Sequence, residues 1–392
     1  MGGALSGLRV IEAGQLIAGP FCGQLMADHG AEVIKIEPPG EGDAMRQWGR
    51  QKPVWFPVIG RNKKCITLNL RDPRGQALAR RLTDGADFLL ENFRPGTLER
   101  WSLGYEELAA TNPGLIMIRV SGFGQTGPYA ARAGYGVIGE AMGGMRHLAG
   151  DPSAPPSRVG LSIGDSLAAT FGCLGGLMAL EHRHRTGRGQ VVDAAIYEAV
   201  LAMLESTVPE YTEAGFVRER TGSILPKVSP SNVYPTRDAS ILIAANQDSV
   251  WRRLAQAMER ADLADDAWFA THHARGEHQA ELDGIISAWS QAWDSTALLG
   301  LLERSGVPAG KIYTAADMLG DPQFVARQAL VHVPHKEFAN LVQQNCFPRL
   351  SETPGEVRWP GPELGEHNEE IYGGLLGLGA LERSDLRAAG II

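Results

Sequence analysis

Asp165 is the carboxylate whose surroundings in this sequence best suit covalent chemistry. It stands in VGLSIGDSLAATFGCLGGLMAL and is the only charged residue between Arg158 and Glu181. Gly164, Asp165 and Ser166 precede an apolar run, a pattern typical of a helix N-terminus. There the helix dipole keeps a carboxylate ionised while apolar neighbours remove its water. Such a group can act as a nucleophile toward an activated acyl group, although an ordinary helix cap has the same pattern.

A second motif, Gly122-Phe-Gly-Gln-Thr-Gly127, matches the G-x-G-x-x-G pattern of dinucleotide-binding loops. That function needs a following helix and then a strand that ends in an acid, whereas Pro128 and scattered glycines follow here. His182 and His184 lie two residues apart and therefore on different sides of a helix. Neither a Walker A sequence nor a G-x-S-x-G elbow is present. We therefore expect no metal site, no serine nucleophile and no nicotinamide.

The composition is that of an ordinary globular chain and excludes several classes of protein. The 392 residues are 44% hydrophobic and 21% charged, with 37 basic residues, 45 acidic residues and a net charge of −8. An acidic chain without a basic cluster is not expected to bind nucleic acid. The uncharged stretch 166–180 is shorter than the ~20 residues of a membrane-spanning helix, so we expect no membrane partner. Dispersed cysteines and no signal sequence favour the cytoplasm.

Alternating strands and helices in the first third of the chain would position these groups. Apolar runs predict strands at 8–13, 32–37, 66–70, 87–91 and 115–120, with helices at 21–28, 76–82 and 98–110. This alternation is typical of an α/β fold with a doubly wound, Rossmann-like parallel sheet and helices on both faces. The segment 193–207 is predicted to be a helix.

A change of pattern near residue 225 predicts a second domain. A loop with Gly222 and Pro226 leads into a hairpin over 232–245 that turns at Arg237 and Asp238. Helices near 249–258, 279–293 and 295–305 follow. We expect a large domain over 1–224, a small α+β domain over 225–325 and a C-terminal segment, 326–392, that returns to the large domain.

Several stretches together resemble the family III CoA-transferases, the CaiB/BaiF group. They are LRVIEAGQLIAGPFCGQLMADHGAEVIKIEPPGEGD, ENFRPGTLERWSLGYEEL, SGFGQTGPY, SIGDSLAA, HRHRTGRGQVVDAAIYEA and LGEHNEEI. They begin at residue 8 and end at residue 371, so the resemblance covers almost the whole chain. The group includes formyl-CoA transferase, carnitine CoA-transferase and, as a relative, alpha-methylacyl-CoA racemase. The resemblance implies acyl-CoA as substrate, a CoA-binding large domain and no permanently bound cofactor.

The resemblance also implies roles for individual residues. The family's nucleophile is the aspartate of the SIGDS-like segment, which is Asp165 here. This carboxylate would attack an acyl-CoA thioester to form an aspartyl–acyl anhydride and then an aspartyl-CoA thioester. Ile17 and Ala18 match contacts of the pantetheine arm, and Tyr135 and Gly136 match positions near the thioester. The other positions that match CoA contacts are Leu68, Asn69, Leu70, Arg71, Asn92, Phe93, Arg94 and Arg100.

Departures from individual relatives bear on the reaction. Pro38 stands where formyl-CoA transferase has an arginine, and RTGSILPKVSPSN stands where it has a mobile glycine run, so formyl-CoA and oxalate are poor candidates. The racemase pairs its aspartate with a histidine in an AGHD-like segment, where this chain has Ala133-Gly-Tyr135-Gly136. A tyrosine of ordinary pKa near 10 is a poor base at neutral pH, which favours a transferase over the racemase alternative.

The resemblance finally implies an interlocked homodimer, because family members thread each chain through the other. We expect succinyl-CoA as donor and a small carboxylic or dicarboxylic acid as acceptor, with Arg46 or Lys227 pairing its second carboxylate. The alternative from another functional class is a non-catalytic acyl-CoA-binding protein, against which the intact SIGDS segment argues.

Overall fold

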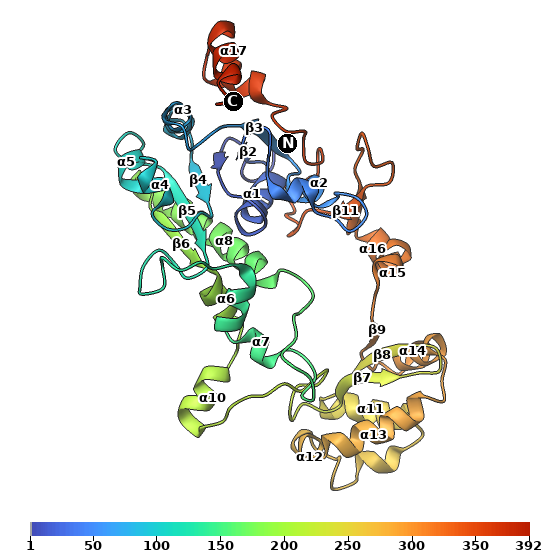
Figure 1. Ribbon diagram of the computed structural model, residues 1–392. Helices are drawn as coiled ribbons and strands as arrows, with labels where there is room; N and C mark the ends of the chain where they lie inside the picture. The colour runs from blue at the N-terminus through green and yellow to red at the C-terminus, as the bar shows by residue number, and fades with distance from the viewer. Residues whose placement is uncertain (1) are drawn as a thin grey trace. The chain divides into compact units, whose positions relative to one another are not determined.

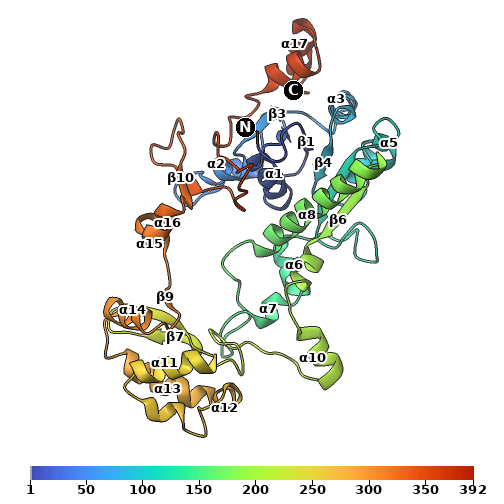
Figure 2. The same ribbon diagram turned by 180° about the vertical axis from the view of Figure 1, so that it is seen from behind.

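The computed structural model describes residues 2–392 and has an α/β architecture (Figures 1 and 2). The chain forms two compact units: one contains residues 2–146, 159–214 and 323–392, and the other contains residues 147–158 and 215–322. The segment 147–158, placed in the large domain by the sequence analysis, thus groups with the smaller unit. One contact that ties it there is the hydrogen bond from the Gly222 N–H to the Gly150 carbonyl, 3.1 Å long.

The larger unit is built on a parallel sheet that has six strands within the described residues. In spatial order they are β3 (Lys63–Thr67), β2 (Glu32–Glu37), β1 (Arg9–Glu12), β4 (Phe88–Glu91), β5 (Ile116–Ser121) and β6 (Val191–Ala195). All neighbouring strands are parallel. The predicted α/β class and doubly wound parallel sheet are confirmed. Strand β6 is a correction, because the sequence analysis assigned residues 193–195 to a helix.

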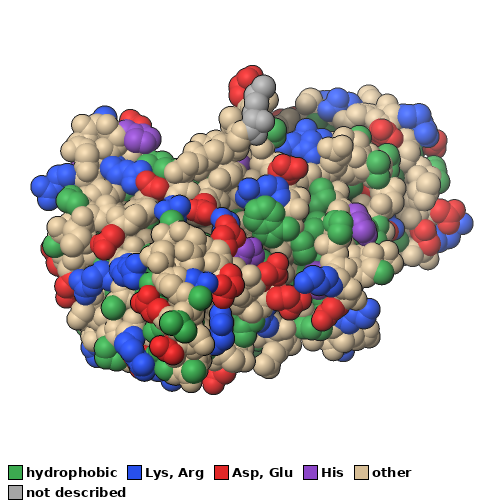
Figure 3. All heavy atoms as spheres, turned by 90° about the horizontal axis from the view of Figure 1, so that it is seen from above, with side chains coloured by type: hydrophobic (Ala, Val, Ile, Leu, Met, Phe, Trp, Pro, Cys, Tyr) green, Lys and Arg blue, Asp and Glu red, His purple; other side chains and the backbone are tan. Residues whose placement is uncertain are grey.

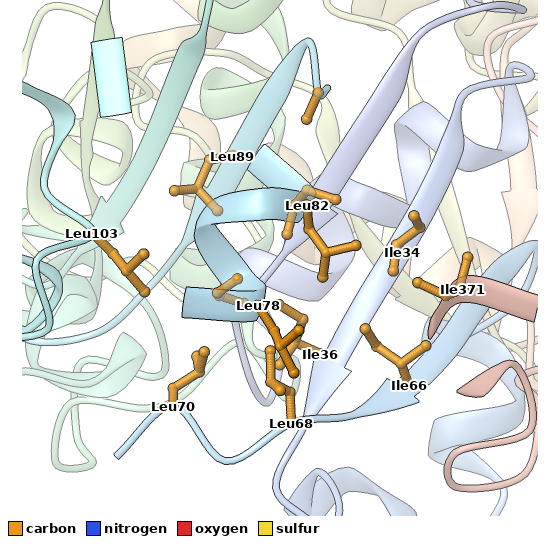
Figure 4. Close-up of a cluster of buried hydrophobic side chains, with 14 of the residues drawn as sticks. Ile34, Ile36, Ile66, Leu68, Leu70, Leu78, Leu82, Leu89, Leu103 and Ile371 are labelled. Carbon is orange, nitrogen blue, oxygen red and sulfur yellow. The ribbon is translucent and has the colours of Figure 1, made fainter. Parts of the chain in front are cut away.

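Helices cover both faces of this sheet. On one face, α1 (Ala18–Asp28) packs against the long helix α8 (Ile163–Thr186). On the other face lies α3 (Pro73–Asp84), and its Leu78 and Leu82 point toward Ile34 and Ile66 of the sheet (Figure 4). The C-terminal segment adds Ile371 to the same cluster. The core is therefore completed by residues from both ends of the chain.

The remaining elements of the larger unit and its junctions are short. The helical segments are η1 (Ala44–Gln47), α2 (Trp55–Ile59), α4 (Thr97–Arg100), α5 (Tyr105–Ala109), α6 (Gly136–Met142), α7 (Met145–Leu148), α9 (Ile196–Leu201), α10 (Thr207–Ala214), α16 (Pro322–Ala326), η3 (Glu369–Leu375) and α17 (Ala380–Ala388). Strands β10 (Leu330–His332) and β11 (Val342–Gln344) form an antiparallel pair. The predicted helix over 98–110 is two short helices instead, because Ser102 adopts a left-handed conformation with φ +52° between them.

The smaller unit has an antiparallel sheet, and its hairpin lies where the sequence predicted it. Its strands are β7 (Ser231–Pro235), β8 (Ser240–Ala244) and β9 (Ala309–Lys311). Its helices are α11 (Asp248–Ala257), η2 (Ala261–Ala264), α12 (His272–Glu277), α13 (Gln279–Ser290), α14 (Ser295–Arg304) and α15 (Ala315–Gly320). The fully buried Trp251 lies in its core.

Helix α8 is long and apolar enough, by length and composition alone, to cross a membrane. The uncharged stretch 166–180 considered in the sequence analysis was too short for this, because the helix extends beyond it at both ends. Within the larger unit its glycines lie against the sheet. A Cβ added at Gly172 would lie 3.2 Å from the Ile118 side chain, and one added at Gly176 would lie 2.7 Å from it. One side of α8 therefore packs closely against the sheet.

Large apolar side chains are nevertheless exposed on the other side of α8 and on its neighbours. Met178 is 62% exposed, Leu174 45%, Leu161 68% and Ile138 46%. On the face seen in Figure 3, hydrophobic, acidic and basic side chains are interspersed. Exposed large apolar side chains on one helix and its neighbours are candidates for a surface that another molecule covers.

Candidate active site at the carboxyl edge of the sheet

The connections after β1 and β4 run in opposite directions along the sheet, which makes this point of the carboxyl edge the expected ligand site of a doubly wound fold. The turns after the two strands are joined by Asn92. Its Oδ1 accepts a hydrogen bond from the Gln15 N–H at 2.8 Å, and its Nδ2 donates one to the Gln15 carbonyl at 2.8 Å. A Cβ added at Gly14 would lie 3.1 Å from Asn92 Oδ1. Asn92 therefore fixes the turn after β1.

A cavity of about 270 Å³ opens at this junction. The sequence-predicted residues that line it are Leu68, Asn69, Leu70, Arg71 and Phe93. Arg94 and Arg100 are not among the described residues that line it. The Arg100 guanidinium instead donates a hydrogen bond to Thr97 Oγ1 at 2.9 Å. Ile17 directly precedes α1, and the buried Ala18 is its first residue. The structure thus brings five of the predicted CoA positions together in one cavity.

Sequence reasoning missed several walls of this cavity. They include Gln15, Glu41, Trp101 and Gly390. Phe93 and Trp101 meet edge to face with their ring centroids 5.3 Å apart. Their separation of eight residues gives no signal in the sequence, and Gly390 is almost 300 residues further along the chain. The cavity thus combines an aromatic pair and aliphatic side chains with polar and charged residues, among them Arg71, Glu37 and Glu41.

Fully buried charged side chains lie beneath the turn after β1. Lys35 Nζ lies 2.8 Å from Asp43 Oδ2 and 3.1 Å from Glu12 Oε1, and Lys63 Nζ lies 2.7 Å from Glu12 Oε2. Burial lowers the pKa of Lys63, whereas the surrounding carboxylates raise the pKa of Lys35 although burial opposes this. Asp43 also accepts from the N–H of Leu16 at 3.1 Å, where the backbone has φ +63°. The charges thereby fix an unusual backbone conformation.

A second buried ion pair lies under the turn after β4. Glu91 accepts from Arg119 Nε at 2.7 Å and from the Phe93 N–H at 2.7 Å. Arg119 also pairs with Glu99 at 2.6 Å. Burial raises the pKa of Glu91 to about 7 because desolvation outweighs Arg119. The hydrogen bond from Arg119 lowers the pKa of the partly exposed Glu99. Glu91 thus anchors the turn that carries Phe93 into the cavity.

Asp165 lies in the first turn of α8, whose N-terminus reaches the same carboxyl edge next to β6. A Cβ added at Gly164 would lie 3.1 Å from Ile196, the residue that follows β6. The half-buried Asp165 carboxyl faces Gly136, the first residue of α6. A Cβ added at Gly136 would lie 2.2 Å from Asp165 Oδ2 and 2.7 Å from its Cγ. The structure therefore brings together two of the predicted residues, and a side chain at position 136 would displace the Asp165 carboxyl.

The G-x-G-x-x-G loop supports this arrangement through close backbone packing. A Cβ added at Gly122 would lie 2.9 Å from the Cα of Gly134, in the segment that leads to α6. The loop is also held by Asp193 of β6, which accepts from the Gln125 N–H at 2.8 Å. Burial raises the pKa of Asp193. Tyr135 directly precedes α6 and is 67% exposed. The loop glycines thus allow two backbone segments to meet close to Asp165.

The cations expected to pair a second substrate carboxylate are already engaged. Arg46 donates to Glu37 at 2.7 Å through Nε and at 2.7 Å through Nη2, and its Nη1 donates to the Pro362 carbonyl at 3.0 Å. Lys227 pairs with Glu277 at 3.1 Å. Arg46 is therefore held by contacts within the larger unit, and its role in acceptor binding stays a prediction.

A larger cavity, of about 550 Å³, adjoins the N-terminal end of α8. Ser166, the neighbour of Asp165, contributes to its lining together with apolar side chains such as Met45, Trp55 and Ile59. Arg61 also lines it, with its Nη2 2.5 Å from Asp28 Oδ2. The walls are therefore mainly apolar with polar groups at one side.

Known proteins resemble this chain over nearly its whole length. Residues 5–368 match the family model of CoA-transferase family III. The succinyl-CoA–D-citramalate CoA-transferase of Chloroflexus aurantiacus is 58% identical over 393 residues, which cover 99% of this chain and 98% of that protein. The beta subunit of succinyl-CoA–L-malate CoA-transferase from the same organism is 39% identical over 396 residues, covering 99% and 98%. The crystal structure of a CaiB/BaiF family protein from Brucella suis has a TM-score of 0.85 at 34% identity and covers 96% of this chain and 100% of that chain.

Proposed function

Since the chain belongs to CoA-transferase family III, we propose that it transfers CoA from succinyl-CoA to a small dicarboxylic acid of the citramalate or malate type. The two relatives named above act with D-citramalate and L-malate, each of which has two carboxylates and a hydroxyl group. The observation that carries the proposal is the Asp165 carboxyl at the N-terminus of α8, packed against the bare backbone of Gly136.

Asp165 is the proposed nucleophile. One of its carboxylate oxygens attacks the thioester carbonyl of succinyl-CoA, and the C–S bond breaks to give an aspartyl–succinyl anhydride and CoA thiolate. The thiolate then attacks the aspartyl carbonyl, which releases succinate and leaves an aspartyl-CoA thioester. The acceptor carboxylate attacks this thioester to form a second anhydride and free the thiolate again. Attack of the thiolate on the acceptor's acyl carbonyl yields the new CoA thioester and restores Asp165.

The cavity at the β1–β4 junction is the proposed site for the nucleotide end of CoA. Its place at the switch point, the Phe93–Trp101 pair and Arg71 support this assignment. The pantetheine arm would then pass Ile17 and Ala18 on its way to Asp165. Amide N–H groups of the Gly122–Gly127 loop are the proposed donors to the oxyanions that form during acyl transfer.

We also propose that the enzyme works as a homodimer in the cytoplasm. The apolar side chains exposed on α8 and its neighbours, such as Met178 and Leu174, support a second copy as their cover. Sedimentation of the purified protein should give the mass of two chains. A monomer at micromolar concentration that retains full activity would contradict this part of the proposal.

Mass spectrometry of the intact protein after incubation with succinyl-CoA and then hydroxylamine tests the reaction. We expect a hydroxamate at Asp165 in the wild type, because hydroxylamine attacks an activated aspartyl carbonyl, and an unmodified protein for Asp165→Ala. The matched control is Asp385→Ala, on the exposed surface of α17. Transfer to D-citramalate, L-malate and succinate analogues is then compared by following the CoA thioesters formed.

The remaining outcomes separate the alternatives. Exchange of an α-proton in deuterated water on a 2-methylacyl-CoA, without an adduct, would indicate a racemase-like enzyme. Tight binding of acyl-CoA with neither signal would indicate a non-catalytic binding protein. An adduct with transfer only to monocarboxylic acids would retain the CoA-transferase mechanism and reject the proposed acceptor class.

A further inference from the structure

The segment Gly390–Ile392 forms one wall of the cavity at the β1–β4 junction. Gly390 lines the cavity, and the Ile391 carbonyl accepts a hydrogen bond from the Asn69 N–H at 2.8 Å. Ile391 and Ile392 are 0% and 5% exposed in the core cluster that also contains Leu68 and Leu70. In both ribbon views the end of the chain lies beside β3 (Figures 1 and 2). The wall is therefore anchored both by packing and by a hydrogen bond to a cavity residue.

Gly390 contributes no side chain to this wall of the cavity. Its backbone has φ +67°, a conformation that favours glycine and, among other residues, is best tolerated by asparagine. A Cβ added there would meet no described atom within 4 Å. Gly390 follows Ala389, the C-cap of α17, and is one of the residues that line the cavity, so a longer side chain at this position has open space beside the cavity.

This wall also lies outside the part of the chain that the family model describes, which ends at residue 368. The other residues that line the cavity include the Phe93–Trp101 pair, Leu68, Arg71 and the acidic Glu37 and Glu41. A flat purine can pack against the apolar and aromatic side chains, while a phosphate can pair with the guanidinium. The free depth between these walls and Gly390 then limits the size of the group that enters.

We propose that Gly390 is a specificity-determining residue for the nucleotide end of the CoA donor. The absence of a side chain there keeps the cavity deep enough for a phosphorylated adenosine. This inference rests on the proposed function, in which this cavity binds the nucleotide. A donor that lacks the nucleotide does not reach the cavity and is insensitive to the residue at position 390.

The test compares Gly390→Asn with a matched control, Gly377→Asn. Gly377 has φ +68° and open space around its Cβ position, and it is not among the described residues that line the cavity. The donors are succinyl-CoA and succinyl-N-acetylcysteamine, which carries the same thioester without the nucleotide. For Gly390→Asn we expect about a tenfold higher KM for succinyl-CoA with little change in kcat, and unchanged kinetics with the truncated donor. The control should resemble the wild type with both donors.

Titration calorimetry of the binding of free CoA tests the inference without relying on turnover. The Kd for CoA should rise about tenfold in Gly390→Asn and stay unchanged in Gly377→Asn, and the Kd for pantetheine should change in neither. Equal kinetic losses with both donors, or equal CoA affinity of the two variants, would overturn the inference. If the wild type bound CoA more tightly than Gly390→Asn but transferred CoA to no acid, the proposed function would be overturned and the inference would stand.

Discussion

Two turns at the carboxyl edge of one sheet are positioned by different forces. The turn through Gln15 and Leu16 is held by the buried charges of Lys35 and Asp43 and by the amide of Asn92. The turn that carries Asp165 lies where glycines allow backbone and side chains to approach closely, as Gly136 does. The first arrangement fixes a binding turn with groups that lie below it. The second leaves room for the carboxyl group of Asp165, the proposed nucleophile, at Gly136.

This difference predicts different failures. Removing one charge from the network leaves its partner buried without compensation, so we expect mainly a loss of stability. Adding one methyl group beside Asp165 moves the reacting carboxyl, so we expect mainly a loss of activity.

The largest effect is expected for Gly136→Ala, because its Cβ would lie 2.2 Å from Asp165 Oδ2. The carboxyl group or the start of α6 must shift, and a displacement of about 1 Å costs on the order of a hundredfold in rate. We expect kcat/KM for succinyl-CoA to fall by about that factor, with a small change in melting temperature. Gly374→Ala, with open space at its Cβ position, is the control. If Gly136→Ala unfolded more readily but transferred CoA at the wild-type rate, Gly136 would matter for stability and not for the position of the Asp165 carboxyl.

The charge-held turn is tested with Asp43→Asn, which keeps the shape of the side chain and removes its charge. Lys35 then retains Glu12 as its nearest partner at 3.1 Å. We expect a loss of about 3 kcal/mol in the free energy of unfolding, measured by urea denaturation, and a higher KM for succinyl-CoA. Asp385→Asn, exposed on α17, should match the wild type. If Asp43→Asn lowered the rate of CoA transfer but left the free energy of unfolding unchanged, the buried charge would not be what holds this turn.

The pH dependence of stability separates Glu91 from the other buried charges. Burial raises the pKa of Glu91 to about 7, above the value near 4.3 of an unfolded chain. The folded protein therefore binds this proton more tightly. Its contribution to stability is complete below about pH 4 and is lost as the pH rises through 7, by up to about 1.4 kcal/mol per unit. Glu91→Gln should remove this slope between pH 5 and 7 in urea denaturation. Parallel profiles of variant and wild type would contradict the assignment.

The smallest effect is expected for Gly284→Ala, in the middle of α13. A Cβ at this exposed position would meet nothing within 4 Å. The substitution should raise the free energy of unfolding by about 0.5–1 kcal/mol because alanine favours the helix, as thermal denaturation would show. Transfer activity should stay unchanged. If Gly284→Ala instead lowered the free energy of unfolding, an added methyl group would be harmful even where it meets no neighbour, and the effect at Gly136 could not be assigned to contact with Asp165.

Most of the larger unit could be predicted from the sequence because its strands are short apolar runs between turn residues. The segments 32–37 and 115–120 lie within one residue of β2 and β5. Strand β6 was missed because Asp193 and the following alanines interrupt its apolar pattern, and because α9 begins directly after Ala195. An edge strand takes its partner from the sheet, and its own sequence carries little of that information.

The candidate site could be predicted only where residues lie close together in sequence or match a family motif. Asp165 was found from its isolation in an apolar segment, and five of the cavity residues came from the family resemblance. Trp101 and Gly390 were not found, because a wall formed by segments hundreds of residues apart leaves no local pattern. The pairing of Arg46 with Glu37 could not be predicted, because it is visible only in the folded chain.

The participation of Ile371, Tyr372 and Ile391 in the core around α3 has a consequence for synthesis on the ribosome. The earlier members of that cluster end with Met117, so the last of these residues emerges more than 270 positions later. At about 5–20 residues per second this delay is about 15–55 seconds. During that time the nascent sheet presents an uncovered apolar face. Molecular chaperones that bind such faces are thus expected to set the yield of folded protein.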